Sequence, residues 1–191
     1  MTQLCTRHYK RQFDERMQLP DFEVESFMDI NFEDLATHIG KPFHAVADLD
    51  HTLRIPSDNV DSAISKHVSM ARAAGSILSF SIATDNIFGR YAPGAVDVAD
   101  KIFRLFIHDR VFVHKPHPAY YSKIVDDIQA PPSSIIMIGN EPYHDIFGAN
   151  LVGMTTIQVP SIGASIPAEF IRHHRGRRII ALGKTAFSKV L

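Results

Sequence analysis

The stretch that decides the fold is His44-Ala-Val-Ala-Asp48-Leu-Asp50-His-Thr52-Leu53, in which a short apolar run leads directly into two carboxylates. The apolar run predicts a buried strand. A helix is expected after it, with Asp58 near its start and Gly75 at its end, because apolar residues between them recur at steps of three and four.

The rest of the chain continues this alternation of strands and amphipathic helices. Further strands are expected at residues 76–83, 111–113, 135–138 and 155–159, with helices over residues 98–106 and 121–128. Such alternation implies right-handed crossovers and a parallel sheet that is covered on both faces. The predicted fold class is therefore α/β, and in such a sheet the ligand site lies beyond the carboxyl ends of the strands.

The residues ahead of the first buried strand carry weaker signals. Apolar and acidic residues alternate over residues 21–26, which indicates a short edge strand. Asn31 is placed to cap a short helix, and Gly40 is placed to end it. We expect residues 1–20 to form an N-terminal extension and residues 21–191 to form a single domain.

Length and composition exclude several classes of protein. The chain has 191 residues, a formal net charge of −1 and 45% apolar residues, which argues against intrinsic disorder and against a nucleic-acid binder that relies on positive charge. The single cysteine, Cys5, excludes an intrachain disulfide framework and fits a reducing compartment. No apolar run approaches the ~20 residues that span a bilayer, and the polar N-terminus is unlike a secretory signal. We expect a soluble, cytoplasmic protein.

Polar side chains follow the expected strands, and these side chains carry the functional argument. They are Asp48 and Asp50 after the first strand, Thr84 and Asp85 after the second, Lys115 after the third, and Asn140, Glu141 and Asp145 after the fourth. Each one alone is typical of a turn or a helix cap. Their occurrence together at the ends of strands in one sheet favours a shared site.

Residues of these types can support phosphoryl transfer. A carboxylate can attack phosphorus to form an aspartyl-phosphate, and a second carboxyl can protonate the leaving oxygen and then activate water. A hydroxyl and an ammonium can hold the phosphate oxygens. Clustered acids and carbonyls suit Mg²⁺, which shields an anionic nucleophile from an anionic substrate.

The same residues resemble the haloacid dehalogenase (HAD) superfamily. Asp48-Leu-Asp50-His-Thr52-Leu53 is similar to its motif I, DxDxT; Thr84 matches motif II, Lys115 motif III, and Gly139-Asn140-Glu-Pro-Tyr-His-Asp145 motif IV. The order and spacing agree over residues 44–159. Leu19-Pro-Asp21 and Asp29-Ile30 also resemble the lead-in of the YqeG-type HAD-IIIA phosphatases, a subfamily that includes the mitochondrial phosphatidylglycerophosphatases.

The resemblance implies a role for each matching residue. Asp48 would be the nucleophile and Asp50 the general acid/base, while Thr84 would bind the transferring phosphoryl group and Lys115 would neutralise Asp48 and phosphate. Asp85, beside Thr84, is a further substrate-binding candidate. The implied Mg²⁺ ligands are Asp48, the backbone carbonyl of Asp50, Asn140 and Asp145. Asn140 stands where the family often has Asp, which removes one negative charge, and Glu141 is a possible substitute.

The spacing also predicts an open site. The intervals from Asp50 to Thr84 and from Thr84 to Lys115 each fit one helix and one strand, so we expect a HAD-like Rossmannoid three-layer sandwich without a cap domain. An open site suits a phosphorylated small molecule or a phospholipid headgroup. The basic cluster from Arg172 to Arg178 and the subfamily resemblance point to phosphatidylglycerophosphate and to peripheral membrane contact.

Two other classes of function fit part of this pattern. A response-regulator receiver domain also combines acids after its first strand with a hydroxyl residue and a lysine, although the Asp48-x-Asp50 alternation favours a phosphatase. A HAD-like scaffold that has lost catalysis and binds a partner is kept open by Asn140. Zinc is disfavoured, because Pro116 separates His114 from His117 and no cysteine accompanies them.

Overall fold

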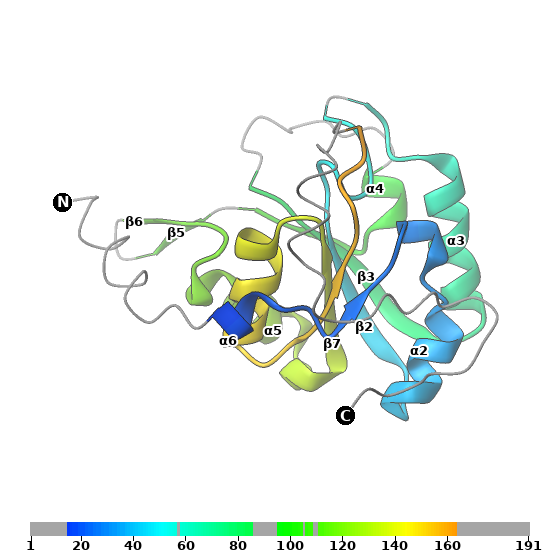
Figure 1. The fold of residues 1–191 in the computed structure, drawn as a ribbon, viewed down its shortest axis with the longest axis horizontal. Helices are drawn as coiled ribbons and strands as arrows, with labels where there is room; N and C mark the ends of the chain where they lie inside the picture. Colours follow the sequence, from blue (N-terminus) through cyan, green and yellow to red (C-terminus); the bar gives the residue numbers. More distant parts are fainter. Residues whose placement is uncertain (1–14, 57, 86–94, 105, 109–110, 164–191) are drawn as a thin grey trace.

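A parallel sheet forms the centre of the molecule (Figure 1). The computed structural model describes residues 15–163, apart from residues 57, 86–94, 105 and 109–110. The sheet has the order β1-β8-β7-β2-β3-β4, and every neighbouring pair runs parallel. Its strands are β1 (Phe22–Glu23), β2 (Phe43–Asp48), β3 (Ile77–Ala83), β4 (Lys101–Phe103), β7 (Ile135–Gly139) and β8 (Thr155–Gln158). The predicted parallel α/β architecture is confirmed.

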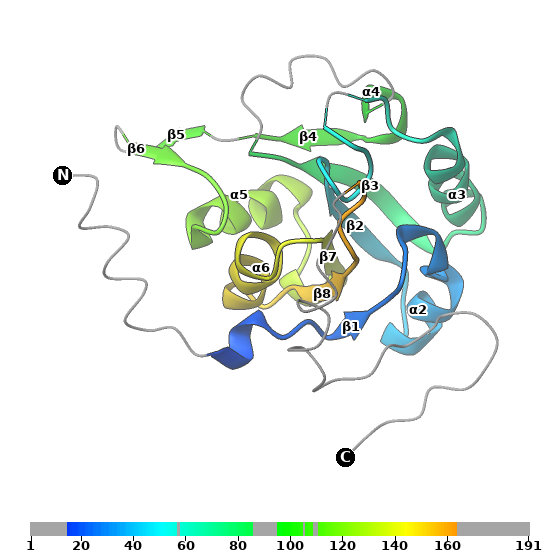
Figure 2. The same ribbon diagram turned by 45° about the horizontal axis from the view of Figure 1, so that its top comes forward.

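Helices cover both faces of this sheet and complete three layers (Figure 2). The helices α2 (Phe32–Ile39) and α3 (Ser62–Ala73) pack on one face, and α5 (Pro118–Ile128) and α6 (Gly148–Leu151) pack on the other. Successive side chains of a strand point to opposite faces, so Ala45 and Ala47 of β2 join the core under α2 and α3 while Val46 joins the core under α5. The central strands are therefore apolar on both sides.

Local capping explains where the first helices begin and end. Asn31 accepts hydrogen bonds from the backbone N–H groups of Glu33 and Asp34, and Gly40 ends α2 with a φ of 79°. The helix α3 begins later than we expected, because Asp61 rather than Asp58 caps it by accepting from the backbone N–H of Ala63. The connection from β2 to α3 is therefore longer than the sequence predicted.

Residues 98–113 depart from the sequence prediction. The expected helix over residues 98–106 is wrong, since α4 (Ala95–Val98) is followed by β4 and then by β5 (Phe106–His108). The expected third parallel strand instead is β6 (Val111–Val113), which pairs antiparallel with β5 in a separate hairpin. Pairing with β3 outweighs the helical spacing here, because β4 supplies the carbonyl of Phe103 to the backbone N–H of Thr84.

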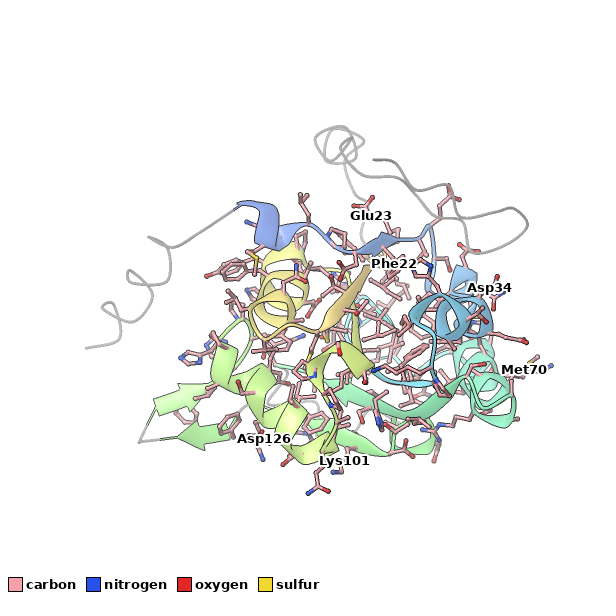
Figure 3. All side chains as sticks on the ribbon, turned by 90° about the horizontal axis from the view of Figure 1, so that it is seen from below. Phe22, Glu23, Asp34, Met70, Lys101 and Asp126 are labelled. Carbon is pink, nitrogen blue, oxygen red and sulfur yellow. The ribbon has the colours of Figure 1, made fainter. Side chains whose placement is uncertain are left out.

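The N-terminal part of the described chain lies along the far edge of the sheet. The predicted edge strand is confirmed as β1, which pairs with β8 and places Phe22 against the body of the protein and Glu23 toward the outside (Figure 3). A short 3₁₀ helix, Glu15–Gln18, precedes it. The side-chain amide of Asn150 donates to the backbone carbonyls of Met17 and Leu19, so this segment is fixed to α6.

The intervals between the candidate site residues are filled by ordinary helices and strands. Between Asp50 and Thr84 the chain forms α3 and β3, and the described part of the next interval forms α4, β4 and the β5–β6 hairpin. Within that described part of the chain these intervals contain no separate cap domain. In the same residues no helix has both the length and the apolar character that a membrane span requires.

Candidate active site

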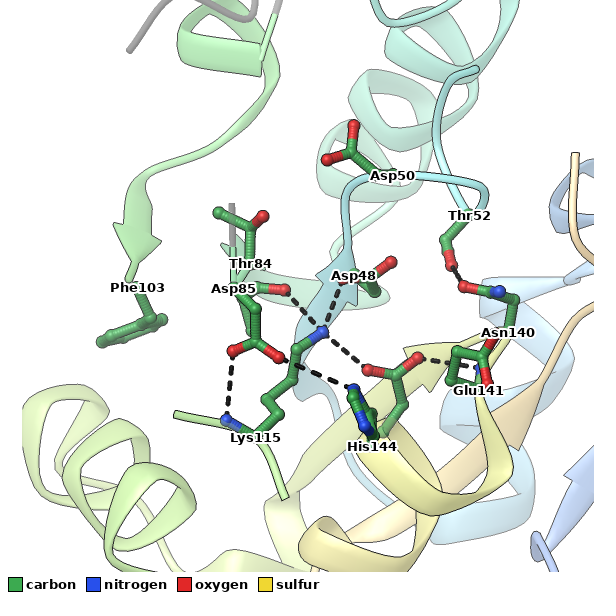
Figure 4. A network of polar contacts seen from close by, with 12 residues as sticks. Asp48, Asp50, Thr52, Thr84, Asp85, Phe103, Lys115, Asn140, Glu141 and His144 are labelled. Atoms are coloured by element: carbon green, nitrogen blue, oxygen red, sulfur yellow. Dashed lines mark hydrogen bonds and ion pairs between the residues drawn. The ribbon is translucent and has the colours of Figure 1, made fainter. Parts of the chain in front are cut away.

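A polar pocket lies at the carboxyl ends of β2, β3 and β7 (Figure 4). Its lining residues are Asp48, Asp50, His51, Thr84, Asp85, Lys115, Asn140, Glu141, His144 and Asp145. All candidates singled out from the sequence are among them. Parallel strands deliver their carboxyl ends to one edge of the sheet, so residues far apart in the chain meet there.

A buried ion cluster occupies the floor of this pocket. The Nζ of Lys115 lies 2.6 Å from Oδ1 of Asp48 and 2.7 Å from Oδ1 of Asp145, and it donates to the carbonyl of Ala83 at 3.3 Å. Lys115 is 3% exposed and Asp145 is fully buried. The cluster thus holds two carboxyl groups against one largely buried ammonium.

The burial and charges of this cluster shift the pKa of its members. Burial, and then repulsion from Asp145, raise the pKa of Asp48 to about 7 against the opposing attraction of Lys115. For Lys115, burial acts against the ammonium form, but the carboxylates of Asp145 and Asp48 outweigh it and raise the lysine pKa well above its ordinary value. Lys115 is therefore a permanent cation beside Asp48.

The polar residues after β3 frame this cluster from one side. Thr84 is buried in the pocket wall. Oδ1 of Asp85 accepts a hydrogen bond from the backbone N–H of Lys115 at 3.0 Å, and its Oδ2 lies 3.8 Å from Nδ1 of His144. Asp85, predicted to bind substrate, thus lines the pocket and also fixes the backbone at Lys115.

The loop after β2 turns sharply and carries Asp50 apart from the buried cluster (Figure 4). Oδ1 of Asp50 pairs with Nε of Arg54 at 2.9 Å. His51 adopts a φ of 66°, and its Nδ1 bonds with the carbonyl of Ile162 at 3.0 Å. The side chains of the two motif acids therefore have different surroundings, with Asp48 beside Lys115 and Asp50 beside Arg54.

The segment after β7 holds its two predicted metal ligands differently. Oδ1 of Asn140 accepts from the hydroxyl of Thr52 at 2.9 Å, and Nδ2 of Asn140 donates to Ser161 at 2.8 Å. Oδ2 of Asp145 accepts from the backbone N–H of Glu141 at 3.0 Å, while its Oδ1 pairs with Lys115. Both carboxylate oxygens of Asp145 therefore already have partners.

Gly139 is required by this arrangement. A Cβ at this position would overlap the side chain of Asp145. The absence of a side chain lets β7 end directly against the buried carboxylate. Gly139 therefore leaves the space in which Asp145 lies beside the end of β7 and pairs with Lys115.

The donors in the pocket fit Mg²⁺ in chemical kind. Mg²⁺ prefers oxygen and is held by one or two carboxylates together with water molecules. Asp48, the backbone carbonyl of Asp50 and the amide oxygen of Asn140 supply such donors around one pocket. Among the residues that the structure describes, no group of three or more His, Cys, Asp or Glu side chains could hold a metal. A magnesium site here needs the backbone and amide oxygens.

Comparison with known proteins gives the family context of this site. Residues 112–180 match the family model described as HAD-hydrolase-like. These residues include Lys115, Asn140 and Asp145. The match supports a place in the HAD superfamily.

Individual curated proteins match a shorter part of the chain. Over 62 residues this chain is 36% identical to a glyceraldehyde 3-phosphate phosphatase of Pyrococcus furiosus. The aligned residues are 32% of this chain and 26% of the relative. The corresponding phosphatase of Pyrococcus abyssi is 32% identical over 62 residues, with the same coverage. The alignment thus spans about a quarter of the length of these curated relatives.

Solved structures show similar partial overlap. A HAD phosphatase from Thermococcus onnurineus is 24% identical, with a TM-score of 0.42 over 51% of this chain and 45% of that one. An uncharacterized protein from Listeria monocytogenes serotype 4b is 15% identical, with a TM-score of 0.49 over 65% and 85% of the two chains. The family-model match over residues 112–180 is what supports the superfamily prediction, whereas the YqeG-type HAD-IIIA subfamily is not confirmed.

Two residues that line the pocket, His51 and His144, and one residue beside it, Arg54, were not identified from the sequence as parts of the site. His51 lies between two HAD motif residues and His144 directly precedes Asp145, so their positions beside motifs were the available signal. Arg54, four residues after Asp50, is the partner of that acid. Its role depends on the turn geometry, which the spacing alone does not reveal.

Proposed function

We propose that this chain is a phosphomonoester hydrolase that works through an aspartyl-phosphate on Asp48. The observation that carries the proposal is the position of Lys115, whose Nζ lies within 2.7 Å of both Asp48 and Asp145 on the floor of an open polar pocket. A fixed ammonium beside a carboxylate lets an anionic phosphate approach an anionic nucleophile. A merely structural ion pair would not need a pocket above it.

The proposed reaction has two steps. In the first, a carboxylate oxygen of Asp48 attacks phosphorus, the bond from phosphorus to the ester oxygen breaks, and Asp50 gives that oxygen a proton. In the second, water attacks the phosphorus and passes a proton to Asp50, while the bond to Asp48 breaks. Inorganic phosphate leaves, and both aspartates return to their starting forms.

Other residues around the pocket assist these steps. Thr84 and Lys115 line the pocket. In the proposed reaction the Thr84 hydroxyl binds a phosphate oxygen and Lys115 offsets charge on the phosphoryl group. Asp145 and Asp85 hold Lys115 by its side chain and by its backbone. A bound Mg²⁺ would offset the charge of Asp48 and phosphate, and Asp48, the Asp50 carbonyl and Asn140 would hold it.

The strand order argues against the receiver-domain alternative. Without the short edge strand β1, the sheet contains β2, β3, β4, β7 and β8. If these five strands are renumbered 1 to 5 along the chain, their order across the sheet is 3-2-1-4-5. Flavodoxin-like folds, to which receiver domains belong, have the order 2-1-3-4-5. The strand order therefore disfavours the receiver interpretation for this chain.

A catalytically weakened scaffold is the second candidate, and Asn140 favours it. Its amide oxygen accepts from Thr52 and its amide nitrogen donates to Ser161, which is a structural use of this position. The pocket would then bind phosphate without turning it over. Wild-type turnover that depends on Asp48 would exclude this candidate.

For the substrate, a phosphorylated small molecule is the class that we propose first. The relatives that match over 62 residues are named as glyceraldehyde 3-phosphate phosphatases. Phosphatidylglycerophosphate remains a prediction from the sequence, and the basic cluster from Arg172 to Arg178 lies outside the described residues. A panel of soluble phosphomonoesters measured beside phosphatidylglycerophosphate in anionic vesicles would separate the two classes.

Turnover of p-nitrophenyl phosphate, in Mg²⁺ or in EDTA, tests the proposed function. Wild type should release p-nitrophenolate only with Mg²⁺, and acid quenching should trap phosphate on the protein. Asp48→Asn should abolish both signals while circular dichroism stays unchanged. Turnover that survives in Asp48→Asn at more than about a tenth of the wild-type rate would remove Asp48 from the nucleophile role, since loss of a nucleophile costs several powers of ten.

A further inference from the structure

Arg54 is an almost fully buried cation at the edge of the proposed active site. Its side chain is 2% exposed, and its guanidinium makes two described polar contacts. Nε lies 2.9 Å from Oδ1 of Asp50, and Nη1 donates to the backbone carbonyl of Asp58 at 2.9 Å. A buried guanidinium needs hydrogen-bond acceptors nearby, and the Asp50 carboxyl and the Asp58 carbonyl supply them.

The backbone of this turn holds Arg54 in a fixed place. The N–H groups of Leu53 and Arg54 both donate to the carbonyl of Leu49, and the N–H of His51 donates to the carbonyl of Arg54 at 2.7 Å. Asp50 and Arg54 are thereby bridged through their backbones as well as their side chains. The guanidinium is a rigid support rather than a mobile surface group.

The carboxyl of Asp50 contacts this support and stands apart from the Lys115 cluster (Figure 4). The bond from Nε of Arg54 to one carboxylate oxygen of Asp50 favours the rotamer in which that contact forms. Proton transfer requires the acid within hydrogen-bond reach of the reacting oxygen, so the rotamer of Asp50 decides whether it can act.

We propose that Arg54 is the positioning residue for Asp50, holding its carboxyl in the orientation that transfers the proton in both steps of the reaction. This inference rests on the proposed function. The described side-chain contacts of Arg54 are with Asp50 and Asp58 and not with Asp48. Its loss releases Asp50 into other rotamers, which slows every step that needs a proton while leaving attack by Asp48 in place.

The two steps respond differently when p-nitrophenyl phosphate is the substrate. p-Nitrophenolate leaves without needing a proton, so formation of the aspartyl-phosphate does not depend on Asp50. Hydrolysis of the aspartyl-phosphate still does, because water must lose a proton as it attacks. Arg54→Gln should therefore slow the second step selectively.

The experiment measures the two steps separately in wild type, Arg54→Gln and Arg54→Lys. Rapid mixing gives the rate and amplitude of the first p-nitrophenolate release, and acid quenching after a chase gives the decay of the phosphorylated protein. In Arg54→Gln the first release should change by less than about 3-fold, and the decay should slow by about 10- to 100-fold. Arg54→Lys keeps the positive charge but lacks the planar guanidinium. Its decay rate should lie between those of wild type and Arg54→Gln.

Arg72→Gln is the matched control. Arg72 also forms an arginine–aspartate pair, with its Nη2 2.7 Å from Oδ2 of Asp100, and it lines none of the pocket. Its removal should lower stability without changing the ratio of the two rates. A selective change in that ratio thus separates positioning of an acid from ordinary loss of an ion pair.

The outcomes distinguish this inference from the proposed function. Normal wild-type turnover with an unchanged rate ratio in both Arg54 variants refutes the positioning role alone. A smaller burst amplitude with unchanged rates also refutes it, because it means only fewer folded sites. A wild-type protein that forms no Asp48-dependent phosphoenzyme refutes the proposed function, and the inference falls with it.

Discussion

The substitution Asp48→Asn should stabilise the protein above pH 7 while it removes turnover. Asp48 lies almost wholly inside the protein, where burial raises its pKa from 3.8 to about 7. Between these two pH values the folded state retains a proton that the unfolded state releases. The free energy of unfolding therefore falls as pH rises through this window, and the stabilising effect of the raised pKa is complete only below about pH 4.

The magnitude follows from that window. Each pH unit corresponds to about 1.4 kcal/mol, so a window of about three units costs wild type about 4 kcal/mol by pH 7. Asparagine keeps the shape of the side chain and does not titrate. It gives up the ion pair with Lys115, but Lys115 keeps Asp145 at 2.7 Å. We expect a net gain of about 2–4 kcal/mol at pH 8 and almost none at pH 4.5.

Urea unfolding followed by circular dichroism in EDTA, from pH 4.5 to pH 8, measures this difference. Asp126→Asn is the control, because Asp126 is exposed on α5 (Figure 3) and its loss should leave the pH dependence unchanged. Parallel stability curves for wild type and Asp48→Asn would refute the reasoning. So would a lower stability of Asp48→Asn at pH 8, since it would mean that Lys115 fully compensates the buried charge.

Three other substitutions test the same region and the sheet below it. Lys115→Met should abolish turnover and lower the free energy of unfolding at pH 7 by about 3–5 kcal/mol in urea titrations, because it leaves two buried carboxylates without a cation. Asn140→Asp should lower the Mg²⁺ concentration for half-maximal turnover by about 10-fold, as an added carboxylate strengthens a magnesium site; an unchanged titration would show that this position does not reach the metal. Burial lowers the pKa of His44, so wild type should lose stability relative to His44→Gln as pH falls from 7 to 5, and equal thermal midpoints across that range would contradict this.

The central strands could be predicted from the sequence because their pattern had one physical interpretation. Residues of β2 and β7 are buried on both faces, so both strands are continuous apolar runs that end in polar residues. Chain order then placed Asp48 and Asp145 at one edge of a parallel sheet. Lys115 also reaches that edge, but it follows β6 of the antiparallel hairpin and not the third parallel strand that the sequence predicted. The lining residues that follow β2 and β7 were predictable from topology and did not require knowledge of any side-chain contact.

Residues 98–113 could not be predicted by the same reasoning. Ala99, Phe103 and Phe106 recur at helical steps of four and three, yet this part of the chain forms the short strands β4 and β5. The choice depends on distant partners, such as the N–H of Thr84 that needs the carbonyl of Phe103. Periodicity within a short segment does not contain that information.

The contacts that set the chemistry were equally hidden, because they join side chains to backbone groups or to distant residues. Asp85 was predicted to bind substrate, and the structure shows it bonded to the backbone N–H of Lys115. Asn140 was predicted from its motif position, and the structure shows its amide between Thr52 and Ser161. Residue type and spacing locate such a site, whereas its polar network follows from three-dimensional placement.

The buried charges of the pocket link stability to function. Two carboxyl groups share one ammonium beneath the open pocket. The surrounding protein does not stabilise the charged form of Asp48, because burial raises the pKa of this carboxyl group. A core selected for stability alone would replace such a cluster with apolar side chains, which are often as stable or more so. The chain instead retains an excess of negative charge at the place where a cation and a phosphate would meet. This is the arrangement expected of a site in which folding free energy is given up for chemistry.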